Sequence, residues 1–96
     1  MRRIIHPAAD AEFAEAVSYY AAVDPKLGIR FYREIERLIF AVCDQPERFF
    51  WFNPPARRVL SRQFPYSVVY LEQPDHVWVV AVMHARRKPG YWRERL

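Results

Sequence analysis

The sequence has 96 residues, 52% of them hydrophobic and 27% charged, which predicts one soluble globular domain over residues 1–96 and excludes a disordered chain. No apolar run approaches the roughly 20 residues of a membrane span, and the N-terminus lacks the apolar stretch of a signal peptide. We therefore expect a cytoplasmic protein without membrane contact. The net charge of +4 is distributed unevenly along the chain. Residues 1–48 carry 7 basic and 8 acidic side chains, whereas residues 49–96 carry 8 basic and 3 acidic ones.

The chain begins with an expected strand and two expected helices. The strand covers residues 2–6, and Pro7 suits the first turn of a helix that runs to about Val23. A second helix follows Asp24, which is a favourable capping residue, and ends before Pro46. Its apolar stripe consists of Leu27, Phe31, Ile35, Leu38, Ile39 and Val42. Because only a tight turn separates the helices, they should form an antiparallel hairpin.

Two details of these helices can be tested against the structure. Arg30 and Glu34 lie off the apolar stripe at i,i+4 spacing, where opposite charges attract weakly. Cys43 is the only cysteine, so it cannot form an internal disulfide, and its apolar helical neighbours predict a buried thiol. His6, His76 and His84 have no metal-site spacing with Cys43, so neither a metal nor a cofactor is expected.

The second half of the chain is predicted to form strands. Residues 46–55, PERFFWFNPP, read as a loop whose four aromatic rings pack on the core, with a partner-binding aromatic patch as the alternative. Strands are expected at 57–62, 67–72 and 76–84, joined by short turns into an antiparallel meander. The last of these is apolar on both faces and belongs in the middle of the sheet. The order β-α-α-β-β-β predicts an α+β fold, with a helical hairpin on one sheet face and the other face partly open.

No glycine-rich phosphate loop and no Ser/His/Asp motif occurs, so the candidate functional residues are cations and rings. On the strands and tail these are Arg57, Arg58, Arg62, His84, Arg86, Arg87, Lys88, Tyr91, Trp92, Arg93 and Arg95. Arginines interleaved with aromatics suit a nucleic-acid backbone, and arginine's planar fork suits any anionic partner. The alternatives are a solvated surface, a dock for an acidic protein segment or, for Tyr91 and Trp92, anchoring of the tail to the core. The carboxylates lie mainly on the helices and are expected to be solvated.

Two segments carry a family resemblance. They are RRVLSRQFPYSVVY at Arg57–Tyr70 and VVAVMHARRKPGYWRERL at Val79–Leu96, and the helix start HPAADAEF fits as well. Together with the element order they resemble the RelE/ParE superfamily of type II toxin–antitoxin toxins, and especially its ParE-like, plasmid-stabilisation branch. The resemblance implies a toxin that a cognate acidic antitoxin neutralises. It also implies one of two actions: inhibition of a protein target such as DNA gyrase, or RelE-like cleavage of mRNA on the ribosome.

The RelE-like cleavage residues are matched incompletely. A RelE-like arginine falls on Ser67, and the RelE-like lysines fall near Arg57–Leu60, where only arginines are present. Arg86 or Arg87 matches the arginine after the last strand, and Tyr91 matches the C-terminal tyrosine. In the cleavage alternative, the catalytic set would be His84, Arg86, Arg87 and Tyr91. Partner or anion binding is expected at Arg57, Arg58, Arg62, Lys88, Trp92 and Arg93. The incomplete match favours gyrase inhibition.

Overall fold

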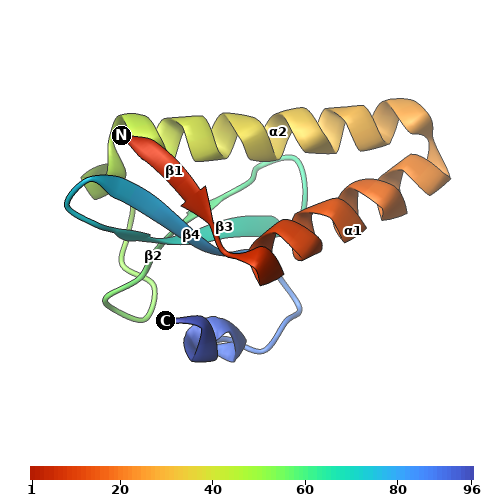
Figure 1. The fold of residues 1–96 in the computed structure, drawn as a ribbon. Coiled ribbons are helices and arrows are strands. Elements are labelled where there is room, and N and C mark those ends of the chain that lie inside the picture. Colours follow the sequence, from red (N-terminus) through yellow and green to blue (C-terminus); the bar gives the residue numbers. More distant parts are fainter.

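Two helices and a four-stranded sheet follow the predicted order β-α-α-β-β-β in the computed structural model, which describes residues 1–96 (Figure 1). The elements are β1 (Arg2–Ile5), α1 (Pro7–Val23), α2 (Pro25–Asp44), β2 (Arg57–Leu60), β3 (Tyr66–Glu72) and β4 (His76–His84), with short 3₁₀ helices η1 (Pro46–Arg48) and η2 (Tyr91–Arg95). The helices form the expected hairpin on one side of the sheet, and η2 lies on the other side. The α+β prediction is confirmed.

The sheet has the strand order β1-β4-β3-β2. β2, β3 and β4 form the predicted antiparallel meander, whereas β1 pairs in parallel with β4, with Arg2 opposite His76 and Ile5 opposite Val79. β4 therefore has a neighbour on each side, as its doubly apolar sequence predicted. β2 ends at Leu60, two residues earlier than expected, because the chain turns at Ser61, whose side-chain oxygen accepts the backbone N–H groups of Gln63 and Phe64.

Both helix starts are capped, and the sequence indicated the cap of α2. Asp24 accepts a hydrogen bond from the backbone N–H of Lys26 at 2.9 Å, and Pro25 occupies the first turn of α2. At the start of α1, Nδ1 of His6 accepts the N–H of Ala8 at 3.0 Å. Five of the six predicted stripe residues of α2 are buried and the sixth, Leu27, is half-buried.

An aromatic cluster joins the hairpin to the sheet. The ring of Phe31 on α2 lies 5.1 Å from that of Phe64 and 4.9 Å from that of Tyr66, both in edge-to-face geometry. Tyr20 of α1 lies 5.0 Å from the rings of Phe31 and Phe64. These rings bury a large apolar area for a small chain, which stabilises the packing of the helices on β3.

The far face of the sheet is covered, contrary to the expectation of a partly open face. The tail folds back after β4 and places Trp92 fully buried against the sheet, beside the half-buried Phe52. The other buried members of this second apolar cluster are Ala56, Val69, Val80, Ala81 and Met83. The rings of Tyr91 and Trp92 indicated anchoring of the tail to the core, but not that the tryptophan would close this face of the sheet.

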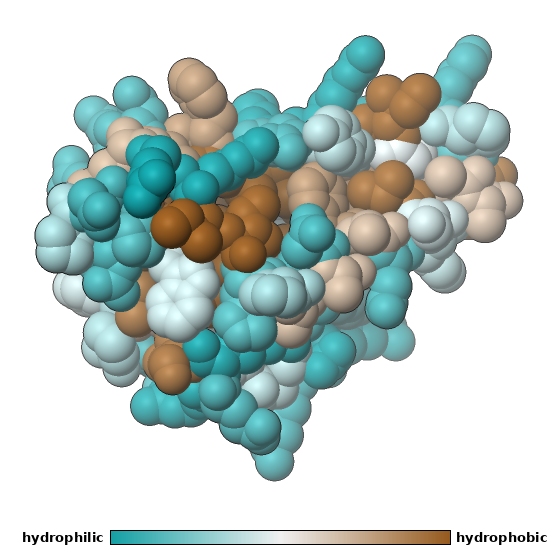
Figure 2. All heavy atoms as spheres, viewed as in Figure 1, coloured by the Kyte–Doolittle hydropathy of each residue, from teal (hydrophilic) through white to brown (hydrophobic).

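Apolar side chains also remain on the surface. In Figure 2 they gather over β1 and at the far end of the hairpin, where Tyr19, Val23 and Ile29 are exposed. No helix is long and apolar enough to cross a membrane.

Gly28 of α2 lies against Ala21 of α1, where the two helices leave no space for a side chain. A Cβ atom added at Gly28 would lie 2.6 Å from the Cβ of Ala21 and 2.9 Å from its Cα. Glycine to alanine in a helix normally stabilises by about 0.5–1 kcal/mol, but here we expect Gly28→Ala to lower the free energy of unfolding by about 1–3 kcal/mol. Urea unfolding of the purified protein measures this.

The matched control for this prediction is the Ala21→Gly background, which removes the clashing methyl group. There Gly28→Ala should cost clearly less stability, because the 2.6 Å overlap with the Cβ of Ala21 is gone and only the backbone of residue 21 remains close, with its Cα at 2.9 Å. A loss of stability of the same size in both backgrounds would contradict a clash with the Ala21 side chain.

Candidate functional site

The loop before β2 holds two large aromatic side chains out to solvent. Phe50 is 85% exposed and Trp51 is 59% exposed, so only Phe49 and Phe52 pack inward as the sequence suggested for all four rings. The loop is nevertheless ordered by hydrogen bonds, because the N–H of Phe52 bonds to the carbonyl of Ala56. Trp51 of the loop also forms an isolated antiparallel bridge with Arg57, the first residue of β2.

The predicted arginines of β2 stack on this loop. The guanidinium of Arg57 lies 3.6 Å from the ring centre of Trp51, and that of Arg58 lies 3.9 Å from the ring of Phe52. Arg57 also donates a hydrogen bond to the carbonyl of Phe49 at 2.7 Å. Arg62 lies beyond the strand and is exposed. Arg58 and Arg62 line a groove between α2 and β2, so the structure brings these two predicted residues together.

A smaller cleft of about 260 Å³ lies at the end of β4 and contains three of the four predicted catalytic residues. His84, Arg87 and Tyr91 line it, and the ring of His84 lies 5.0 Å from that of Tyr66. Arg86 does not line this cleft and is exposed to solvent. The structure therefore brings together His84, Arg87 and Tyr91 but leaves Arg86 outside.

Glu12 of α1 is the centre of the polar contacts in this cleft. Its carboxylate accepts a 2.7 Å hydrogen bond from the hydroxyl of Tyr91 and two 2.9 Å bonds from the guanidinium of Arg95. It also accepts the backbone N–H of Val82 at 3.1 Å, while Arg95 donates to the carbonyl of Val80. Because β1 ends at Ile5, these contacts cover the part of the β4 edge that β1 leaves unpaired.

These contacts limit the chemistry that the cleft can perform. Burial and the hydrogen bond to Glu12 raise the pKa of Tyr91 far above its ordinary value, so its hydroxyl stays protonated at neutral pH. Nδ1 of His84 accepts the backbone N–H of Arg86 at 3.0 Å, which leaves only Nε2 for other partners. Arg87 stacks 3.9 Å from the ring of Tyr91. The cleft thus contains groups held in structural contacts, with Tyr91 bonded to Glu12 and Arg87 stacked on Tyr91.

The remaining predicted binding residues all lie in the C-terminal tail. Lys88 and Arg93 are exposed, and neither forms an ion pair. Trp92 was a candidate for partner binding, but it is fully buried in the second apolar cluster. No three His, Cys, Asp or Glu side chains gather where they could hold a metal ion.

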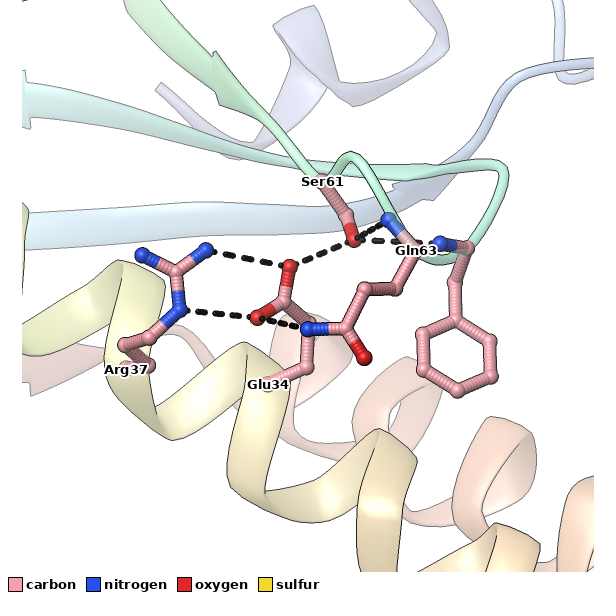
Figure 3. Close-up of polar contacts among 5 residues, drawn as sticks. Glu34, Arg37, Ser61 and Gln63 are labelled. Atoms are coloured by element: carbon pink, nitrogen blue, oxygen red, sulfur yellow. Dashed lines mark hydrogen bonds and ion pairs between the residues drawn. The ribbon is translucent and has the colours of Figure 1, made fainter.

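A second carboxylate that the sequence placed in solvent is buried beside the α2–β2 groove. Glu34 is 3% exposed and accepts hydrogen bonds from Arg37, from Ser61 at 2.7 Å and from Gln63 at 3.3 Å (Figure 3). Arg37 binds it through two nitrogens, at 2.8 and 3.2 Å. The predicted pairing of Glu34 with Arg30 is therefore wrong, and Arg30 instead lies 5.6 Å from the ring of Phe64.

These contacts explain how Glu34 tolerates burial. Burial alone raises its pKa, but the hydrogen bonds from Arg37 and Ser61 and the charge of Arg37 outweigh it, so its pKa lies below the ordinary value. The carboxylate fastens the turn after β2 to α2 and holds Arg37 in one orientation. Two of its partners, Ser61 and Gln63, lie far along the chain, so no local pattern at Glu34 revealed them.

Comparison with known proteins places this geometry in a family. The family model described as "ParE toxin of type II toxin-antitoxin system, parDE" matches residues 3–89. A solved structure titled "Chromosomal ParDE TA system from P. aeruginosa" is similar in fold, with a TM-score of 0.71, 13% sequence identity and coverage of 88% of this chain and 95% of that one. No curated protein sequence matches the chain. The family match spans most of the sequence, and the chain therefore belongs to the ParE toxin family of type II toxin–antitoxin systems.

Proposed function

We propose that this toxin arrests growth by binding a protein target, with DNA gyrase as the candidate, and that an acidic antitoxin neutralises it in the cytoplasm. The observation that carries the proposal is the Glu12 carboxylate, which accepts the hydroxyl of Tyr91 and the guanidinium of Arg95. A metal-free ribonuclease needs a free acid or base near the scissile phosphate. Here the hydroxyl of Tyr91 is protonated and donates to Glu12, and Nδ1 of His84 accepts a backbone N–H, so of these two side chains only Nε2 of His84 is free to act as an acid or base.

The rival function is ribosome-dependent mRNA cleavage, and one observation favours it. His84, Arg87 and Tyr91 share the cleft at the end of β4, as a cleavage site would require. Two assays on the purified protein separate the functions. Loss of supercoiling by gyrase on addition of the toxin supports the proposal, and toxin-dependent cuts in translated mRNA, mapped by primer extension, overturn it.

The variant Tyr91→Phe sharpens this test. It removes the hydroxyl that donates to Glu12 and leaves both bonds from Arg95, so we expect a loss of about 0.5–1.5 kcal/mol in stability and full growth arrest on induction. Tyr19→Phe is the matched control, because Tyr19 lines the same cleft, is 66% exposed and has no hydrogen-bonded partner there. Growth arrest that disappears in Tyr91→Phe while the protein remains folded would argue for the cleavage function.

A further inference from the structure

The carboxylate of Glu12 is held as a ligand is held in a binding site, by donors that all come from β4 and the tail. Each of its two oxygens accepts two hydrogen bonds. Oε1 accepts the backbone N–H of Val82 at 3.1 Å and one nitrogen of Arg95 at 2.9 Å. Oε2 accepts the hydroxyl of Tyr91 at 2.7 Å and the other nitrogen of Arg95 at 2.9 Å. The side chains of Glu12 and Arg95 are each only 16% exposed, so these contacts lie largely away from water.

The donors are positioned by contacts that do not involve Glu12. The N–H of Val82 belongs to β4, the central strand of the sheet. Arg95 also donates to a carbonyl of β4 at 2.9 Å, and its guanidinium lies 5.1 Å from the ring centre of Tyr91. Both residues belong to η2, which the fully buried Trp92 fixes on the sheet. Oriented donors lose little conformational freedom when they bind an anion, so Val82, Tyr91 and Arg95 form a preformed donor site.

The charge of Arg95 makes the donor site selective for anions. Without Glu12, a mostly buried guanidinium would have no carboxylate paired with it, and an uncompensated charge in the protein interior is costly. Arg87 adds a second cation to the cleft, where the only other lining carboxylate is the exposed Glu15. A guanidinium, a hydroxyl and a backbone N–H are donors that bind carboxylates and phosphates in proteins. The site therefore matches one oxyanion of either kind.

The other buried carboxylate has a different environment. Glu34 is paired with Arg37, whose side chain is 61% exposed, so water can solvate that cation when the carboxylate is absent. Its remaining partners, Ser61 and Gln63, are uncharged. The need for a bound anion is therefore specific to the site that Glu12 fills.

We infer that the donor site is an oxyanion-binding site and that Glu12 is its internal ligand, which keeps carboxylates and phosphates out of the cleft. While Glu12 is in place, it takes up all four hydrogen bonds, so an outside anion finds no free donor there. Because Glu12 itself lines the cleft, its removal opens the donor site to solvent. The inference goes beyond the proposed function, since it concerns what the cleft can bind and holds whichever target the toxin has.

Chemical rescue of Glu12→Ala tests the inference. The measurement is the Tm of the purified full-length protein at pH 7 in phosphate, acetate or chloride of equal ionic strength. We expect the variant to melt below wild type in chloride, and phosphate or acetate at about ten times its Kd to raise the Tm by about 5–10 °C. Phosphate stabilises proteins in general, so the rise is compared with that of wild type. A variant that is unfolded in chloride should regain its folded circular dichroism spectrum in phosphate.

Three further variants locate the bound anion. Glu12→Gln fills the donor site with a neutral side chain of the same size, so it should be destabilised but should gain less than about a third of the rescue of the alanine variant. Glu12→Ala/Arg95→Met lacks the cation and should lose the rescue. Glu36→Ala is the matched control, because Glu36 accepts two hydrogen bonds from Arg3 at a more exposed position. It should respond to phosphate as wild type does.

Three results would overturn the inference. The first is a response of Glu12→Ala to phosphate and acetate that is no larger than that of wild type, or a variant that stays unfolded in all three salts. The second is a rescue that persists in Glu12→Ala/Arg95→Met, which would place the anion elsewhere. The third is a rescue of equal size in Glu36→Ala, which would show a general response to the loss of a carboxylate.

Discussion

Replacing Trp92 with alanine is expected to lower the free energy of unfolding by about 3–5 kcal/mol, the largest effect of any single substitution in the tail. Trp92 is fully buried, and it holds η2 against the far face of the sheet together with Val69, Val80 and Met83. The substitution leaves a cavity and removes the main apolar contact of the tail. Since a domain of this size has a total stability of roughly 5–15 kcal/mol, the loss is a large share of it. Urea denaturation followed by far-UV circular dichroism measures the change.

Trp92→Phe is the matched control. The indole N–H of Trp92 is buried without a hydrogen-bond partner, so phenylalanine removes ring area but no hydrogen bond. We expect it to cost less than about 1.5 kcal/mol. A Trp92→Ala protein with nearly unchanged stability would show that the tail contributes little to the fold. A phenylalanine variant as unstable as the alanine variant would point to a polar contact of the indole.

The second large effect is expected at Arg37 and depends on pH. Arg37→Met removes the cation that pairs with Glu34 and leaves the carboxylate buried with Ser61 and Gln63 as partners. We expect a loss of about 2–3 kcal/mol at pH 7, because an uncompensated charge then remains in the protein interior. The exposed surface of Arg37 keeps this value below that of a fully buried pair.

The pH dependence reverses in this variant. In the wild type the pKa of Glu34 lies below its ordinary value of 4.5, so its contribution is present above that pH and is lost as the pH falls through the folded pKa. In Arg37→Met, burial becomes the dominant influence and raises the folded pKa, so stability is lost as the pH rises past the ordinary value. The difference between the two proteins should therefore shrink between pH 7 and pH 4.

Arg33→Met provides the control for this prediction. Arg33 is an exposed arginine of the same helix, and it has no ion-pair partner. Its replacement should change stability by less than about 0.5 kcal/mol at either pH. If the penalty of Arg37→Met is the same at pH 4 and pH 7, the carboxylate of Glu34 is not the cause.

The sequence predicted those features that depend on local periodicity. The apolar stripe of α2, the capping by Asp24 and Pro25, and the central position of β4 all follow from spacing or residue type within one element. The parallel pairing of β1 with β4 has no such signature, since the partner strand comes from the other end of the chain. The strand was therefore predicted, but its neighbour was not.

The polar contacts were harder to predict because their partners are distant in sequence. Glu34 looked like a solvated residue, although Ser61 and Gln63 make its burial tolerable. The family resemblance placed Tyr91 in one candidate site with His84 and Arg87, and the three side chains line one cleft. The resemblance did not show that Glu12 would accept the hydroxyl of Tyr91. Trp92 was a candidate either for partner contact or for anchoring the tail, and the structure shows that it completes the core. In each case the residue type indicated which interactions the side chain could make, but its actual partners come from distant parts of the chain and depend on the tertiary structure.

The pairing of β1 with β4 has a consequence for when the protein becomes active during its synthesis. The first strand emerges from the ribosome long before the strand that binds it, and the α1–α2 hairpin folds locally with no sheet yet beneath it. The central strand of the sheet is the last to be made, so no shorter nascent chain can assemble the native surface. Toxicity should therefore begin only after nearly the whole chain has been translated, and translation that stops before β4 should yield a harmless fragment.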